Sequence, residues 1–269
     1  MTHEHVARSG KAGPTAYSVI GQGAPVVLIH GVGMAREIWA PQVKDLSKSY
    51  QVICYDLLGH GQSDLPPAGV ALNAYAEQLS SLLDVLRVES TYLVGHSMGA
   101  LVALEFALSF RARTRKVAAL NAVFERSAEQ RLGVQDRAAA LQREGPVASI
   151  EPTLERWFGN PIPTELQEVA QLAARLLRSV NPVGYARTYQ LFANSDAVHA
   201  TRLPGLKVPA LFMTGEFDLN SSPSMSAAMS RLVPGSQFKV IAQARHMMNL
   251  THPAQVTHAL LDFLGHHPC

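Results

Sequence analysis

The chain has 269 residues, of which 47% are hydrophobic and 16% charged, and its formal net charge at pH 7 is +2. This composition allows a sizeable core and excludes a largely disordered chain, and the absence of a basic run argues against nucleic-acid binding. No apolar run reaches the roughly 18 residues of a membrane span, and the first five residues lack the layout of a signal peptide.

Two cysteines, Cys54 and Cys269, are too few for a disulfide framework. Cys54 lies within a strand-like run and Cys269 is the last residue. We therefore expect reduced thiols and a cytoplasmic location.

Strand-like and helical segments alternate along most of the chain. After a polar stretch at 1–14 that we expect to be mobile, apolar runs predict strands at 16–20, 24–29, 50–55, 91–94, 116–120, 208–214 and 237–241. Helical patterns follow at 39–47, 73–86, 100–108, 222–232 and 254–264. Several of the strand-like runs are apolar without alternation, as in strands buried on both faces. The alternation predicts an α/β fold with a mostly parallel central sheet flanked by helices, with its site at the carboxyl ends of the strands.

The alternation stops in the middle of the chain. Between 124 and 205 the sequence shows no convincing strand, but helical stretches at 128–144, 149–158, 165–179 and 185–192, separated by Gly-Pro and Asn-Pro pairs. We predict a core formed by 15–123 and 206–266, with 124–205 inserted as a helical lid, or cap.

The clearest motif is Gly95-His96-Ser97-Met98-Gly99, between a strand-like run and a helix-forming run. A serine between glycines at this spacing is typical of a strained strand-to-helix turn that exposes the serine hydroxyl. The pattern predicts that Ser97 is a nucleophile and that the amide of Met98 stabilises an oxyanion.

A serine nucleophile needs a base and a carboxylate that orients the base. Asp218 and His246 each follow a late predicted strand, and the order Ser97, Asp218, His246 is that of a hydrolase triad. Glu216 and Glu125 are alternative acids, because both also lie just after predicted strands.

Taken together, these segments resemble the α/β-hydrolase superfamily from about residue 17 to 264. The resemblance rests on His30-Gly31-Val32-Gly33, Gly59-His60-Gly61-Gln62-Ser63, the Ser97 turn, Gly215-Glu216-Phe217-Asp218 and His246. It implies Ser97 as nucleophile, His246 as general base and acid, and Asp218 as its orienter, with backbone amides of Val32 and Met98 forming the oxyanion hole. The lid layout is most similar to 3-oxoadipate enol-lactonases and small carboxylesterases. Arg245 departs from the family, which usually has glycine before the histidine.

Candidate substrate contacts are less specific in the sequence. Trp157 either lines a pocket under the lid or packs the lid on the core. One of several arginines could hold a substrate carboxylate, with Arg187 and Arg245 as the main candidates and Arg156, Arg175 and Arg178 as others. We expect His30, His96, Asp56, His60 and Asp64 to shape the loops around the site.

The predicted activity is hydrolysis of a carboxylic ester or enol-lactone through an acyl-enzyme, without a metal or organic cofactor. Alternatives are a carbon–carbon bond hydrolase of the meta-cleavage type, an acyltransferase or perhydrolase, and a ligand receptor without catalysis. The expected partner is a small carbonyl compound, with no nucleic acid or membrane partner, and the chain could form a homodimer.

Overall fold

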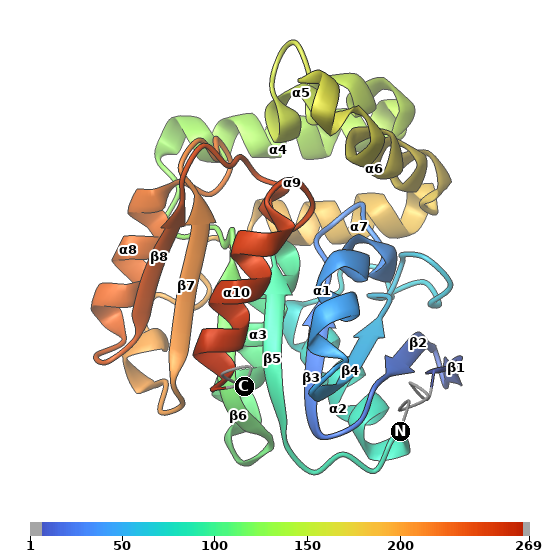
Figure 1. The fold of residues 1–269 in the computed structure, drawn as a ribbon. Coiled ribbons are helices and arrows are strands. Elements are labelled where there is room, and N and C mark those ends of the chain that lie inside the picture. Colours follow the sequence, from blue (N-terminus) through green and yellow to red (C-terminus); the bar gives the residue numbers. More distant parts are fainter. Residues whose placement is uncertain (1–6, 266–269) are drawn as a thin grey trace.

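An eight-stranded sheet forms the centre of the computed structural model, which describes residues 7–265 (Figure 1). The strands are β1 (Ala7–Ala12), β2 (Thr15–Ile20), β3 (Ala24–Ile29), β4 (Tyr50–Tyr55), β5 (Thr91–His96), β6 (Thr114–Leu120), β7 (Ala210–Gly215) and β8 (Gln237–Ile241). Their order across the sheet is β1-β2-β4-β3-β5-β6-β7-β8. The β1–β2 and β2–β4 pairs are antiparallel and the other pairs are parallel, so that β3 to β8 end at the same edge.

Helices cover both faces of this sheet. Outside the cap they are α1 (Ala40–Leu46), α2 (Leu72–Val85), α3 (Met98–Ser109), α8 (Pro223–Leu232), α9 (Met248–Thr251) and α10 (Pro253–Leu264). Helices α1 and α10 contact each other on one face, and α2 and α3 lie together on the other (Figure 1). Helix α3 is apolar on most of its surface and buried for 11 of its 12 residues, Glu105 among them, because it lies between the sheet and neighbouring helices.

The four cap helices lie between β6 and β7 in the sequence and extend over the carboxyl ends of the strands (Figure 1). They are α4 (Ala128–Glu144), α5 (Ile150–Phe158), α6 (Gln167–Ser179) and α7 (Pro182–Ala193). Helix α4 begins with a capping box between Ser127 and Gln130. Helix α7 begins three residues earlier than the sequence pattern predicts, because Asn181 caps it and Pro182 is its first residue, where a missing N–H costs nothing.

The expected mobility of residues 1–14 is wrong for residues 7–12, and residues 1–6 lie outside the described residues. Residues 7–12 form β1, which pairs along its whole length with β2. The segment ARSGKA has no alternating apolar pattern, so only the hairpin partner reveals it as a strand. The thiol of Cys54 is buried in β4, and Cys269 lies outside the described residues.

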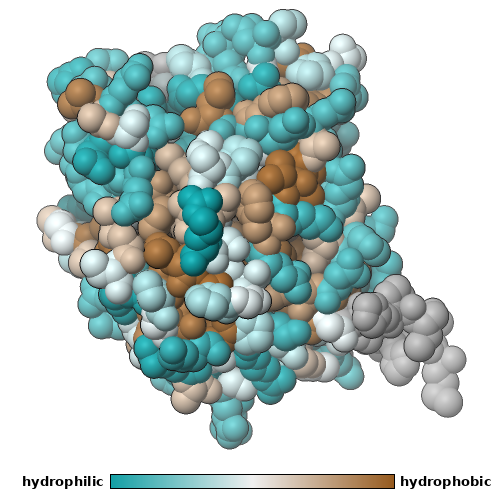
Figure 2. Space-filling view, turned by 90° about the vertical axis from the view of Figure 1, so that its left-hand side faces the viewer, coloured by the Kyte–Doolittle hydropathy of each residue, from teal (hydrophilic) through white to brown (hydrophobic). Residues whose placement is uncertain are grey.

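At the far edge of the sheet, the first four residues of β8 are exposed. Figure 2 shows the side of the molecule on which β8 and α8 lie, where hydrophobic residues are interspersed with hydrophilic ones. Lys239 in this edge strand opposes uncontrolled strand pairing.

The homodimer stays a prediction. Within residues 7–265, no helix combines the length and apolarity needed to cross a bilayer.

Candidate active site

Ser97 lies at a sharp turn between β5 and α3. Its backbone angles, φ 56° and ψ −118°, fall in a region that L-residues rarely adopt. A Cβ on Gly95 would lie 2.1 Å from the carbonyl oxygen of Gly99, and one on Gly99 would lie 2.3 Å from that of Ile29. Both glycines are therefore required for β3, β5 and α3 to approach each other, which explains the spacing of the motif.

A chain of hydrogen bonds joins Ser97, His246 and Asp218. The distance from His246 Nε2 to Ser97 Oγ is 3.2 Å, and that from His246 Nδ1 to Asp218 Oδ2 is 2.8 Å. The three residues come from the ends of β5, β7 and the loop after β8, and all three are about 3% exposed. This arrangement allows the imidazole to take the serine proton while the carboxylate fixes the orientation of the ring.

Four donors surround the carboxylate of Asp218. Oδ2 accepts hydrogen bonds from His246 Nδ1 and Asn121 Nδ2, both at 2.8 Å, and Oδ1 accepts them from the amides of Asn220 and Ser221 at 2.8 and 3.1 Å. Burial alone would raise the pKa of Asp218, but the charge and hydrogen bond of His246, with the other donors, hold it below its usual value. Asp218 is therefore ionised beside the imidazole at neutral pH.

The two alternative acids lie elsewhere. Glu216 Oε2 accepts a hydrogen bond from the amide of Gln243, and Glu125 is exposed before α4. Among the described residues, Asp218 is the carboxylate that hydrogen-bonds His246.

Three buried histidines shape the loops around Ser97. His60 Nε2 accepts a hydrogen bond from the amide of Gly33, and His30 Nε2 accepts one from the amide of Leu57. Burial lowers the pKa of His30 to about 4 and that of His60 to about 3, so both rings are neutral acceptors. His96 packs beside His246, with its Nε2 at 2.8 Å from the backbone oxygen of that residue.

The predicted oxyanion donors lie on opposite sides of this serine in the sequence. Val32 directly precedes Gly33, whose amide binds His60, and it lines the cavity above Ser97. Met98 is the first residue of α3, and its amide has no acceptor within the helix. Asp56 is engaged with Arg36, which its Oδ2 binds at 2.8 Å, and with the amide of Gln62, so it holds the neighbouring loop.

A cavity of about 420 Å³ lies between Ser97 and the cap, a size that suits a small molecule. Side chains of α4, α5 and α7 form much of its wall, together with Val32 and the loop after Asp218. The residues that line it are Val32, Ser97, Arg126, Glu129, Gln130, Gly133, Val134, Arg137, Thr153, Arg156, Trp157, Tyr185, Tyr189, Phe192, Leu219, Asn220 and His246. The indole of Trp157 stacks on the His246 ring with centroids 5.7 Å apart, so the cap contacts the triad directly.

Two of the predicted substrate contacts are not in this cavity. Arg187 donates a hydrogen bond to the carbonyl of Pro66 at 2.6 Å and lines a separate surface pocket. Arg245 points away from the cavity even though His246 follows it. It lies against Gly159 and lines a smaller cavity beyond Trp157. Neighbouring residues on a loop point in different directions, so the position of Arg245 next to His246 in the sequence does not place its side chain in the same cavity.

Asn121, Arg126 and Arg137 are among the residues at the site that the sequence did not predict. Asn121, which binds Asp218, directly follows β6, and its position after a strand was the available signal. Arg126 and Arg137 line the cavity, but in the sequence they lie just before and within a polar helical stretch, where arginines are typical of a surface. Within residues 7–265, no group of three or more His, Cys, Asp or Glu residues could hold a metal ion.

Residues 24–253 match the family model described as alpha/beta hydrolase fold. The chain belongs to this family. The match confirms the predicted fold class, and the parallel strands β3 to β8 with helices on both faces agree with it.

Two relatives whose names are those of hydrolases match most of the chain. The chain is 37% identical over 245 residues to an (E)-2-((N-methylformamido)methylene)succinate hydrolase of Acinetobacter baylyi, over 91% of each chain. It is 28% identical over 239 residues to 3-oxoadipate enol-lactonase 1 of the same species, over 89% of this chain and 88% of that one.

Among solved structures, an enol-lactonase from Burkholderia xenovorans is similar with a TM-score of 0.87 and 26% identity, covering 96% of this chain and 99% of that one. A thermophilic esterase from Thermogutta terrifontis has a TM-score of 0.84 and 30% identity, covering 97% and 98%. The resemblance to enol-lactonases is thus confirmed, and the chain is a hydrolase.

Proposed function

We propose that the chain is a serine hydrolase that cleaves an acyl bond of a small carboxylate-bearing molecule through a covalent acyl-enzyme. The observation that carries the proposal is the hydrogen-bonded series Ser97–His246–Asp218 at the floor of a cavity of about 420 Å³. A hydroxyl, a base and an ionised carboxylate in this order activate the serine for attack on a carbonyl carbon.

In the first step Ser97 Oγ attacks the carbonyl carbon while His246 Nε2 takes the hydroxyl proton. The amides of Val32 and Met98 stabilise the negative oxygen, and the N-terminus of α3 adds favourable electrostatics. His246 then gives the proton to the leaving group. Water, deprotonated by the same imidazole, attacks the acyl-enzyme and releases the acid, which regenerates Ser97.

The names of the two relatives indicate which types of acyl bond this chain could cleave. One describes a formamide attached to a succinate unit, and the other an enol-lactone of an oxoadipate. Both functional groups are acyl derivatives that the same two steps would cleave, with nitrogen or oxygen as the leaving atom. We therefore extend the ester or enol-lactone prediction to include an activated amide, and Trp157 stays a proposed substrate contact because it faces the cavity.

Initial rates on a panel of compounds test the proposal. The panel contains 4-nitrophenyl acetate, an acidic enol-lactone, an N-formyl enamide of succinate and a meta-cleavage dienoate, each with wild type and Ser97→Ala. We expect wild type to turn over at least one acyl compound. In Ser97→Ala the rate on that compound should fall on the order of 1,000-fold or more, as is usual when a nucleophile is removed. Turnover of the dienoate alone would support the carbon–carbon hydrolase instead. Acyl turnover that persists in Ser97→Ala would refute the proposal.

A further inference from the structure

Three arginines from the cap line the cavity above Ser97. Arg126 precedes α4, Arg137 lies in α4 and Arg156 in α5. Glu129 is the only glutamate or aspartate on the cavity wall within the described residues, and it is exposed. The cap side of the cavity therefore carries an excess of positive charge. An arginine already paired with a carboxylate of the protein has a structural role, whereas one without such a partner is available to bind an anion.

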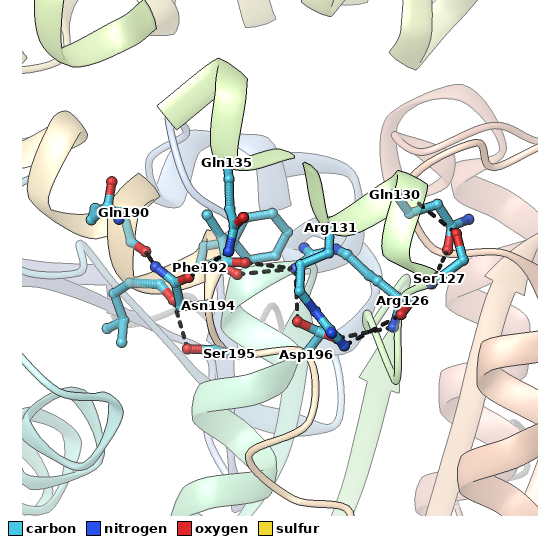
Figure 3. Close-up of polar contacts among 12 residues, drawn as sticks. Arg126, Ser127, Gln130, Arg131, Gln135, Gln190, Phe192, Asn194, Ser195 and Asp196 are labelled. Carbon is cyan, nitrogen blue, oxygen red and sulfur yellow. Dashed lines mark hydrogen bonds and ion pairs between the residues drawn. The ribbon is translucent and has the colours of Figure 1, made fainter. Parts of the chain in front are cut away.

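Arg126 is neutralised within the protein. Its guanidinium lies 3.5 Å from Asp196 Oδ1, its Nη1 donates to the carbonyls of Phe192 and Ala193, and it stacks on the Phe192 ring. Its amide also binds Asp196, which in turn pairs with Arg131 (Figure 3). This cluster joins the start of α4 to the segment after α7, so Arg126 has a structural role at the base of the cap.

Arg156 and Arg137 differ in this respect. Arg156 donates from Nη2 to Thr153 Oγ1 at 2.8 Å, while its Nε is buried without a hydrogen-bond partner. Arg137 donates from Nε to the hydroxyl of Tyr189 at 3.3 Å. In the part of the chain that the structure describes, no carboxylate lies within 4.0 Å of either guanidinium.

The surroundings of Arg156 disfavour its positive charge, because no anionic side chain of the described residues lies beside it. Burial lowers the pKa of Arg156, the charge of Arg137 lowers it further, and the hydroxyls of Tyr189 and Tyr185 act in the opposite direction. A partly buried cation with an unused N–H donor and a second cation beside it is costly unless an anion binds there. A carboxylate matches the planar guanidinium and can accept two hydrogen bonds from it.

We propose that Arg156 and Arg137 form a carboxylate subsite on the cap, which binds an acid group of the substrate remote from the carbonyl that Ser97 attacks. The substrate class is thus a small acyl compound with a free carboxylate at its other end, and hydrolysis of an ester or lactone of this class gives a dicarboxylate. The inference rests on the proposed function for the position of the scissile bond. The binding of the carboxylate itself does not depend on catalysis.

The first test compares two esters of matched length, monoethyl glutarate and ethyl pentanoate, which differ in a terminal carboxylate. We expect wild type to prefer the acidic ester, and we expect Arg156→Gln to reduce the ratio of the two kcat/KM values by about 10–100-fold, the usual effect of losing a charge-assisted hydrogen bond. Arg137→Gln should reduce it less, and Arg156→Lys should retain part of it. Arg175→Gln is the matched control, because Arg175 is an exposed arginine on α6 outside the cavity.

The second test measures binding without turnover. Glutarate is titrated into Ser97→Ala by calorimetry at constant ionic strength, with sodium chloride as the ion control and Tm checked for every variant. We expect saturable binding to Ser97→Ala, with a Kd that is at least about tenfold higher in the double variant Ser97→Ala/Arg156→Gln. Glutarate binding that needs Arg156, together with a wild-type protein that turns over no compound of the panel, would uphold the subsite and refute the hydrolase proposal. Serine-dependent turnover with equal preference for both esters, unchanged in Arg156→Gln and Arg156→Lys, would overturn the subsite alone.

Discussion

Replacing Asp218 by asparagine tests the role of the carboxylate most directly. The two oxygens of Asp218 each accept two hydrogen bonds, whereas asparagine offers one oxygen and one NH₂ group. If the amide oxygen stays at the Oδ1 position, the NH₂ group faces His246 Nδ1 and favours the tautomer protonated on Nε2. That nitrogen then cannot take the Ser97 proton. If the amide is reversed, its NH₂ group faces the backbone donors of Asn220 and Ser221.

We expect kcat of Asp218→Asn to fall by about 10³–10⁴-fold, or about 4–5.5 kcal/mol of activation free energy, because the wrong tautomer predominates. The assay is steady-state hydrolysis of the best substrate at pH 7.5, with the Tm measured to show that the variant is folded. Asn121→Gly is the matched control. It removes one donor to Asp218 without changing the tautomer, and glycine tolerates the positive φ of 51° at this position, so we expect a loss of only about tenfold.

A folded Asp218→Asn variant with kcat within tenfold of wild type would refute the reasoning. Glu125 and Glu216 would then be the candidate acids. With Asp218 as the acid, replacing either of them by glutamine should have little effect on kcat.

Two further predictions concern stability, and a third concerns the substrate contact proposed for Trp157. Gly95→Ala should prevent folding or lower stability by more than about 3 kcal/mol, because its Cβ would lie 2.1 Å from a backbone oxygen, whereas Gly133→Ala, in the middle of α4, should be stabilising; thermal unfolding compares the two, and equal Tm values would contradict this. A hydrogen bond from His199 and other donors lower the pKa of Glu105 to about 2, so this carboxylate stabilises the fold above pH 4.5 by on the order of 1–3 kcal/mol, and the stabilisation is lost as the pH falls toward 2. Urea unfolding at pH 7 and 3.5 should show this pH dependence reduced in Glu105→Gln, and identical pH dependence would count against it. Trp157→Ala should raise KM about tenfold, because the indole lines the cavity and stacks on the triad imidazole, and an unchanged KM would remove Trp157 from the proposed substrate contacts.

Much of the architecture could be predicted because local patterns report it directly. The apolar runs of β3 and β4 have the bounds predicted from the sequence, since strands buried on both faces are hydrophobic without interruption. The glycines around Ser97 indicated the sharp turn because only residues without side chains fit between the crossing backbones. Strand β1 could not be predicted, because its pairing with β2 is a property of the hairpin and not of its own residues.

The sequence by itself determined the fold class, the strained turn at Ser97 and the three residues of the candidate triad, because each of these depends on residue type and on position relative to a strand. Only the tertiary structure decided which arginines face the cavity. Arg187 and Arg245 point elsewhere, whereas Arg137 and Arg156 line the cavity that contains Ser97. The direction of each side chain depends on how the cap helices and the loop after β8 pack on the core. That docking is set by contacts between segments far apart in the chain, and no local pattern records it.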